Sequence, residues 1–238
     1  MRHIPITAGL VLFAGTLAAQ DEVAYMRDGL SAVRAEDHEK AIEALTHAIA
    51  LDPGEARAWL YRGLSREATG DRTGAQHDLD RAVALAPNDA NILLRRGEMA
   101  IGAGRFDRAM QDLRHVIELD PESPIAVHAR FTIGQAYVAQ DRYDEAYTIY
   151  DELVREFPDD AKAICDRGIA LGHLDRNTEA VADLDRALML DPDLVMAYAS
   201  RAIALIALDR KSDACPDLQK AYDMGDPSVA ELLVIYCF

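Results

Sequence analysis

The chain has 238 residues, half of them apolar, and its 41 acidic residues outnumber the 25 basic ones to give a net charge of −16. An acidic surface repels nucleic acid and anionic lipid headgroups, and no basic stripe with interleaved aromatic residues occurs, so nucleic-acid binding is excluded. The apolar fraction is ample for an elongated chain whose neighbouring units share one core.

The first nineteen residues predict a secretory signal peptide. Arg2 precedes an apolar run from Ile4 to Ala19, which ends in small residues. A short apolar run with a basic start and a small-residue end is typical of a cleaved signal rather than of a membrane span. We expect cleavage of residues 1–19 and a periplasmic or secreted mature protein, with an uncleaved anchor as the alternative. Gln20 stands where a lipoprotein needs cysteine, which argues against a lipid anchor.

Proline recurs at a nearly fixed interval through the rest of the chain. Each of five prolines lies in an acidic or small-residue turn, and their spacings are 34, 34, 37 and 34 residues: Pro53, Pro87, Pro121, Pro158 and Pro192. A period in this range marks an array of similar supersecondary units, none of which can bury its apolar face alone. The sequence therefore predicts a stacked helical repeat protein.

The residues between the prolines repeat in one register. Each block has a small residue midway down its expected first helix, namely Gly29, Gly63, Gly97, Gly134, Gly168 and Ala202. Each has a large apolar residue in its second helix, namely Leu45, Leu79, Leu113, Tyr150, Leu184 and Leu218. This pattern resembles the tetratricopeptide repeat family, in which small residues lie where two helices cross closely. The resemblance implies an all-α, right-handed α-solenoid of six repeats over residues 22–226.

The fourth repeat departs from the others. We place the repeats at 22–55, 56–89, 90–123, 124–160, 161–194 and 195–226. The fourth has three extra residues, Pro124 to Ala126, which should lengthen either the turn before its leading helix or the first turn of that helix. Its sequence resembles the longer repeat variant of bacterial envelope-assembly and cell-division proteins, so a secreted or periplasmic bacterial type is expected.

Four repeats carry an arginine just before the small residue of the first helix and an aspartate just before the large residue of the second. These residues are Arg62, Arg96, Arg167 and Arg201, with Asp78, Asp112, Asp183 and Asp217. The first and fourth repeats lack both members, so presence and absence agree in all six. We expect structural ion pairs that join the two helices of a repeat or reach the neighbouring repeat, rather than a charged ladder for a ligand.

Residues 227–238 predict a capping helix with Ser228 as its N-cap, and Pro216 fits the first turn of the helix before it. Cys215 and Cys237 each lie eleven residues from the centre of the intervening turn, so an antiparallel hairpin brings them to the same end. An oxidising compartment permits their disulfide, and two reduced thiols are the alternative. Similar cysteine-bearing endings occur in secreted proteins of the tetratricopeptide type.

Members of the tetratricopeptide family usually bind partners on the face lined by the first helices. Carried over by register, the groove consists of Met26, Leu30, Arg57, Leu60, Leu64, Glu67, Asn91, Leu94, Glu98, His128, Phe131, Gln135, Lys162, Ile169 and His173, together with Cys165, Met196 and Ile203. Such a mixed surface suits a helix or an extended segment of a protein partner, although about half of the aliphatic residues should pack between repeats. The lysine and asparagine cluster with which some members clamp a terminal carboxylate is absent.

Nothing in the sequence points to catalysis, a cofactor or a metal. Cys165 and His173 share one helix face, but eight residues separate them by roughly 12 Å, too far to bind one ion. No nucleophile elbow, phosphate-binding glycine loop or zinc-ligand spacing occurs. We expect a non-enzymatic protein without a cofactor or metal.

Two functions from different classes remain. The first is a scaffold or adaptor in the bacterial periplasm that binds one protein partner in its groove, with envelope assembly or cell division as the process it would serve. The second is a holdase-like chaperone that binds many unfolded chains through the apolar floor. Neither involves nucleic acid or stable membrane insertion after signal cleavage, and self-association is a third role that stacked repeats permit.

Overall fold

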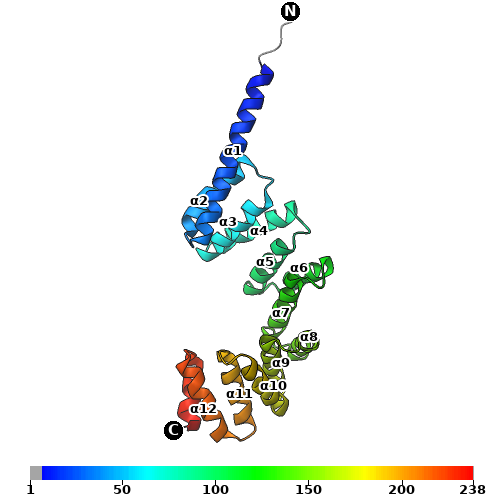
Figure 1. Ribbon diagram of the computed structural model, residues 1–238, viewed down its shortest axis with the longest axis vertical. Helices are drawn as coiled ribbons and strands as arrows, with labels where there is room; N and C mark the ends of the chain where they lie inside the picture. Colours follow the sequence, from blue (N-terminus) through cyan, green and yellow to red (C-terminus); the bar gives the residue numbers. More distant parts are fainter. Residues whose placement is uncertain (1–6, 238) are drawn as a thin grey trace, which may run out of the picture. The chain divides into compact units, whose positions relative to one another are not determined.

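The computed structural model describes the backbone of residues 7–237 and the side chains of residues 20–237. This part of the chain contains thirteen α-helices and one short 3₁₀ helix and has no strand (Figure 1). It divides into two compact units, of which unit 1 ends at Asp120 and unit 2 begins at Pro121. The side chains of the predicted signal peptide lie outside the described residues.

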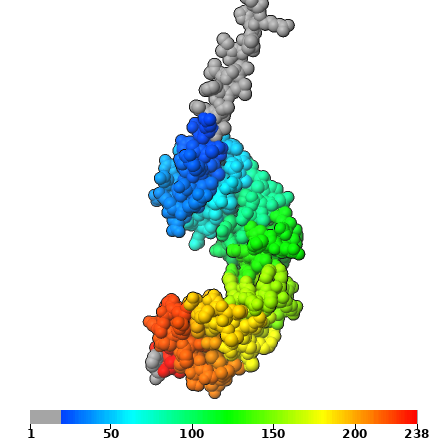
Figure 2. Space-filling model, in the orientation of Figure 1, coloured from blue at the N-terminus to red at the C-terminus, as the bar shows by residue number. Residues whose placement is uncertain are grey.

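Each unit is a succession of helix-turn-helix pairs, and within a unit neighbouring pairs lie against one another in the space-filling view (Figure 2). Unit 1 contains α1 (Thr7–Arg34), α2 (His38–Leu51), α3 (Ala56–Ala68), α4 (Arg72–Leu85), α5 (Ala90–Gly102) and α6 (Phe106–Leu119). Unit 2 contains α7 (Pro124–Val138), α8 (Tyr143–Glu156), α9 (Ala161–His173), α10 (Asn177–Leu190), α11 (Val195–Ala207), α12 (Lys211–Asp223), η1 (Pro227–Val229) and α13 (Ala230–Cys237). None of the described helices has the length and apolar character needed to cross a membrane.

The two helices of a pair cross at the small residue of the first helix. A Cβ atom added to Gly29 would lie 2.7 Å from Leu45 Cγ, and one added to Gly134 would lie 2.5 Å from Tyr150 Cζ. The large partner follows the glycine by sixteen residues in each case and is at most 1% exposed. Close backbone approach at the crossing thus lets a bulky side chain pack directly against the first helix.

Helix boundaries follow from local hydrogen bonds. Asp89 caps α5 by accepting from the backbone N–H groups of Asn91 and Ile92, and Ser123 caps α7 by accepting from Ala126. The first helices end in a left-handed residue, such as Gly104 with φ of 70°. The next N–H then reaches back to a carbonyl in the last turn, as from Arg105 to Ala100 at 2.8 Å. This Schellman-type ending satisfies carbonyls that would otherwise lack donors.

The extra residues of the fourth repeat enter two places. Helix α7 has 15 residues, whereas α9 and α11 have 13 each, so two extra residues lengthen the helix. The third lies in the turn 139–142 before α8, which is one residue longer than the turn 174–176. The turn before α7, residues 120–123, has the same length as residues 86–89, so of the two expected sites only the helix is lengthened.

The C-terminal end differs from the sequence prediction in two details. Asp226, not Ser228, is the N-cap, because its Oδ1 accepts from the Ser228 N–H at 2.9 Å. Pro216 is the sixth residue of α12, beyond the first turn, so the carbonyl of Ser212 loses its helical donor. The following helix α13 packs on α12 through Leu233, which is 7% exposed.

Candidate functional site

The predicted groove residues lie on the first helices, which are α1, α3 and α5 in unit 1 and α7, α9 and α11 in unit 2. We call the exposed side of these helices the first-helix face of each unit. Most of the predicted residues are exposed or half-buried there: Leu30, Arg57, Leu64, Glu67, Asn91, Glu98, His128, Phe131, Gln135, Lys162, Ile169 and His173. Met196 and Ile203 are 64% and 54% exposed.

Three of the predicted groove residues are instead buried, which corrects the sequence prediction. Met26, Leu60 and Leu94 are 9%, 6% and 5% exposed, and Cys165, at the same register position, is 4% exposed. Met26 packs in the core of the first repeat, and Leu60 packs with Leu79 and the start of the next repeat. These positions lie at the seam between neighbouring helices, where most of an apolar side chain is used for packing between the repeats.

A depression of about 360 Å³ lies between α3 and α5 in unit 1, and we call it the arginine pocket. Its lining consists of Arg57, Leu60, Tyr61, Leu64, Asp89, Asn91 and Arg95. The structure thus brings together Arg57, Leu64 and Asn91 from the predicted groove and the exposed edge of Leu60. Sequence reasoning missed Tyr61 and Arg95, which directly follow the seam positions 60 and 94 and could have been found by extending the register by one residue.

Two carboxylates, those of Glu67 and Glu98, lie on α3 and α5. Partial burial raises the pKa of Glu67, and the nearby Glu98 carboxylate raises it further, while Arg72 and Arg95 act in the opposite direction. Arg95 donates to Glu98 at 2.8 Å and keeps half of its side chain exposed. Arg57 thus lies near the N-terminus of α3 and Glu67 near its C-terminus, while Arg95 and Glu98 are paired with each other on α5.

Unit 2 has a smaller depression on its first-helix face. A pocket of about 110 Å³ between α9 and α11 is lined by Gly168, Ile169, Gly172, His173, Asn177, Ser200, Ile203 and Ala204. The small residues leave room at its floor, and the imidazole of His173 stacks on the ring of Tyr143 at a centroid distance of 4.2 Å. We call this site the apolar pocket; it contains Ile169 and His173 from the predicted groove and Asn177 and Ser200, which the prediction missed.

Lys162 is engaged within unit 2. Its Nζ lies 2.6 Å from an Asp166 carboxylate oxygen and 4.5 Å from the ring centroid of Phe131. Burial raises the pKa of Asp166, and the Lys162 ammonium partly offsets that rise. This lysine therefore contributes little free positive charge to the face, and His128 and Gln135 lie exposed on α7 outside the apolar pocket.

The four arginines of the repeated pairs each make a bidentate contact with the aspartate sixteen residues later. Nε and Nη2 donate to the two carboxylate oxygens at 2.6–2.8 Å in Arg62–Asp78, Arg96–Asp112, Arg167–Asp183 and Arg201–Asp217. The remaining Nη1 donates to a side chain sixteen residues earlier, namely Thr46, Asp80, Asp151 and Asp185. Each arginine thus joins the helices of its own repeat and also reaches the preceding repeat, so the two arrangements left open by the sequence coexist.

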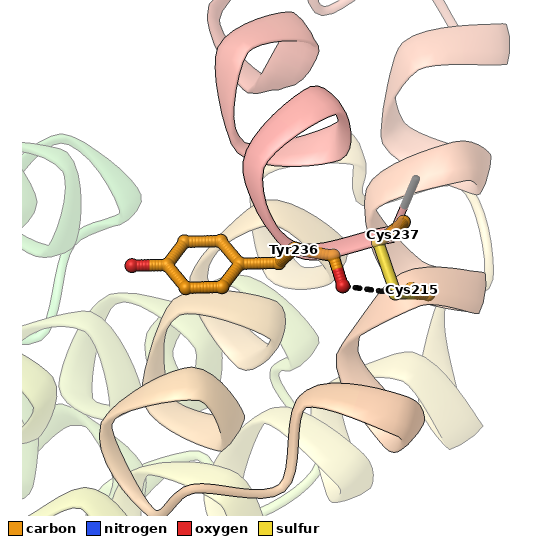
Figure 3. The surroundings of a disulfide bond; sticks show 3 residues. All are labelled: Cys215, Tyr236 and Cys237. Atoms are coloured by element: carbon orange, nitrogen blue, oxygen red, sulfur yellow. Dashed lines mark hydrogen bonds between the residues drawn. A yellow bond between two sulfur atoms is a disulfide. The ribbon is translucent and has the colours of Figure 1, made fainter.

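The three cysteines occupy two environments. Cys215 and Cys237 form a disulfide with their Cα atoms 5.7 Å apart, linking α12 to the end of α13 (Figure 3). The Cys215 sulfur lies 3.6 Å from the Tyr236 carbonyl oxygen, a packing contact because a disulfide sulfur has no proton to donate. Cys165 is a buried free thiol, and burial raises its pKa to about 12, so it holds no reactive thiolate at neutral pH. No cluster of three metal-ligating side chains occurs among the described residues.

Comparison with known proteins identifies the repeat. Family models described as tetratricopeptide repeat match residues 27–75 and 62–124, residues 100–164, and residues 161–194. No curated protein sequence matches the chain significantly.

Several solved structures share the fold. PilW, described as a widely conserved type IV pilus biogenesis factor, is 17% identical with a TM-score of 0.77, over 89% of this chain and 98% of that one. PilF of Pseudomonas aeruginosa is 15% identical with a TM-score of 0.74, over 91% and 98%. MamA is 21% identical with a TM-score of 0.64, over 74% and 94%. At these identities the likeness establishes the all-α solenoid fold and nothing finer.

Proposed function

The chain belongs to the tetratricopeptide repeat family, and on this premise we propose that it is a non-enzymatic adaptor that binds a segment of one partner protein on its first-helix faces. The observation that carries this proposal is the apolar strip on unit 2. Met196 and Ile203 project from α11 two helical turns apart, both more than half exposed, and Ile203 borders the apolar pocket together with Ile169. Grouped apolar side chains beside a small pocket are typical of a surface that buries a partner's anchor residue.

We place this adaptor in the bacterial periplasm, with envelope assembly or cell division as the process it serves. The predicted signal peptide and the Cys215–Cys237 disulfide both favour a compartment outside the cytoplasm. The similar structures include PilF of a bacterium and the pilus biogenesis factor PilW, which supports an envelope process without identifying one.

Photocrosslinking in the cell that naturally contains the chain tests the proposal. The reactive side chain replaces Ile203 in one variant and Met189 in the other. Met189 is a matched control because it is apolar, 78% exposed and in the same unit, but lies on the second helix α10. The adaptor predicts one discrete adduct from Ile203 that is absent from Met189. Many adducts from Ile203 would indicate a holdase-like chaperone instead, and equal labelling or none from Ile203 would contradict binding at this face.

A further inference from the structure

We propose that the arginine pocket of unit 1 recognises an acidic segment of the partner protein, with the guanidinium groups of Arg57 and Arg95 and the amide of Asn91 binding its carboxylates. This inference rests on the proposed function and deepens it by naming the chemistry of the partner.

Arg57 differs from the arginines that follow it on α3. Arg62 and Arg66 both donate to the buried carboxylate of Asp78, at 2.8 and 2.9 Å. The side chain of Arg57 is exposed and makes no ion pair among the described residues. In a chain of net charge −16, a guanidinium left without a carboxylate in a lined depression is a site of charge complementarity for an acidic partner.

Arg95 supplies a second guanidinium from the adjacent helix α5. One of its Nη atoms is used by Glu98, but half of the side chain remains exposed in the pocket. The planar guanidinium has five N–H donors, so this single contact leaves donors that can bind a carboxylate. Asp89 is the acidic member of the lining, and its carboxylate already accepts from two backbone N–H groups as the cap of α5. The lining therefore has two guanidinium groups and one carboxylate; Arg95 shares its charge with Glu98, and Arg57 is the guanidinium without a carboxylate partner.

The floor of the pocket favours a peptide over a small hydrated anion. Tyr61, Leu64 and the exposed edge of Leu60 contribute apolar surface to the lining, and the volume of about 360 Å³ accommodates side chains of more than one residue. Apolar surroundings lower the local dielectric constant and strengthen each carboxylate–guanidinium contact relative to water. A segment with acidic and apolar residues together fits both features.

The same face also indicates how the segment is oriented. Glu67 lies near the other end of α3; its side chain is exposed and makes no ion pair among the described residues, so it can pair with a cation of the segment. Arg57 and Glu67 are ten residues apart on α3, about 15 Å at the helical rise. An extended segment covers that distance in about five residues. We therefore expect a basic residue about five positions from the acidic one in the bound segment.

The test uses a photocrosslinker at Leu64, inside the arginine pocket, in the full-length chain and its natural cell. The Arg57→Glu/Arg95→Glu background reverses the charge of the pocket. The Arg81→Glu/Arg114→Glu background changes the net charge equally on exposed residues of the second helices α4 and α6. Thermal melts followed by circular dichroism establish that all three backgrounds fold.

We expect a discrete adduct at Leu64 whose yield falls at least about tenfold in the Arg57→Glu/Arg95→Glu background and stays within about twofold in the control. Mass spectrometry should map the attached segment to an acidic stretch. Retention of the adduct after pocket reversal, an equal loss in the control, or attachment to a segment without acidic residues would overturn the acidic-segment inference while leaving the adaptor in place. An adduct at Ile203 with none at Leu64 would also overturn the acidic-segment inference and leave the adaptor in place. The absence of adducts at both positions would overturn both proposals.

Discussion

At the scale of single residues, the most consequential polar group is Asp78. Its side chain is fully buried and receives Arg62 through a bidentate contact as well as Arg66. Through Arg62 this carboxylate joins the two helices of the second repeat. The same arginine also donates to the hydroxyl of Thr46 in the first repeat. Burying charge is tolerated here because every oxygen is hydrogen-bonded to a cation.

Asp78→Ala should therefore lower the free energy of unfolding of unit 1 by about 3–5 kcal/mol, since it leaves the nearly buried Arg62 guanidinium without its counter-charge. Asp80→Ala is the matched control on the same helix. Asp80 is 38% exposed and accepts from Arg96, which retains its own bidentate partner Asp112, and from the partly exposed Arg108, so the cost should stay below about 1 kcal/mol. Urea unfolding followed by circular dichroism measures both values. A similar decrease in the free energy of unfolding for the two variants would show that burial of an ion pair does not decide how much it stabilises the unit.

The sequence was sufficient to pair these residues but not to describe their surroundings. Four repeats contain both the arginine and the aspartate, and two contain neither. This agreement alone indicates that the two residues are in contact. The second contact of each arginine, sixteen residues earlier, was left open because Thr46 accepts in one case and an aspartate in the others. Likewise Leu60 and Leu64 are both apolar, and only packing shows that the first lies in the seam and the second on the face.

At the scale of helices, the repeat period predicts elements well and irregular joints poorly. The small residue at the helix crossing recurs six times and the proline turn five times, so each copy supports the others. The fourth repeat and the C-terminal end occur once, and there the prediction missed the longer turn before α8, the Asp226 cap and the interior position of Pro216. A single occurrence leaves only local propensity, which is a weak guide to where a helix begins.

Helix α13 depends on the disulfide more than on its own length. It has eight residues, too few for an isolated helix to be stable in water, and its outer side exposes Val234 and Ile235 by 68% and 59%. Leu233 and Val229 anchor it to α12, and Cys237 ties its last turn to Cys215. The covalent link compensates for the small apolar area that so short a helix can bury.

Reduction should therefore loosen α13 selectively. The bridge spans 22 residues, for which the chain-entropy model gives about 3 kcal/mol of stabilisation. We expect dithiothreitol to lower the urea concentration at the unfolding midpoint of unit 2. It should also speed amide hydrogen exchange in residues 230–237 while α9 stays protected. The Cys215→Ser/Cys237→Ser variant should show the lower midpoint with or without reductant. An unchanged midpoint in the reduced wild-type chain would contradict a stabilising role for the bridge.

At the scale of the whole molecule, the ion-pair ladder is internal to each unit. In unit 1 it runs through Arg62 and Arg96, and in unit 2 through Arg167 and Arg201. The fourth repeat, which opens unit 2, has Ile133 at the arginine position. The repeat before it has Arg114 where the other ladders have an acceptor, so the sequence supplies neither member of a link between the third and fourth repeats. The six-repeat period predicts one array, whereas the internal contacts divide it into two units.

We therefore predict that the two units unfold as separate cooperative blocks, as expected when stability is a sum of local repeat terms and neighbour terms. Hydrogen exchange with mass spectrometry at increasing urea should give one exchange midpoint for the helices α2 to α6 and another for α7 to α12. The Asp78→Ala variant provides the test, because its cost should appear only in the first block. Its counterpart, Asp183→Ala, removes the bidentate partner of Arg167 and should lower the exchange midpoint of the second block only. Equal loss of protection in both blocks for either substitution would mean that the chain folds as one cooperative array despite the interrupted ladder.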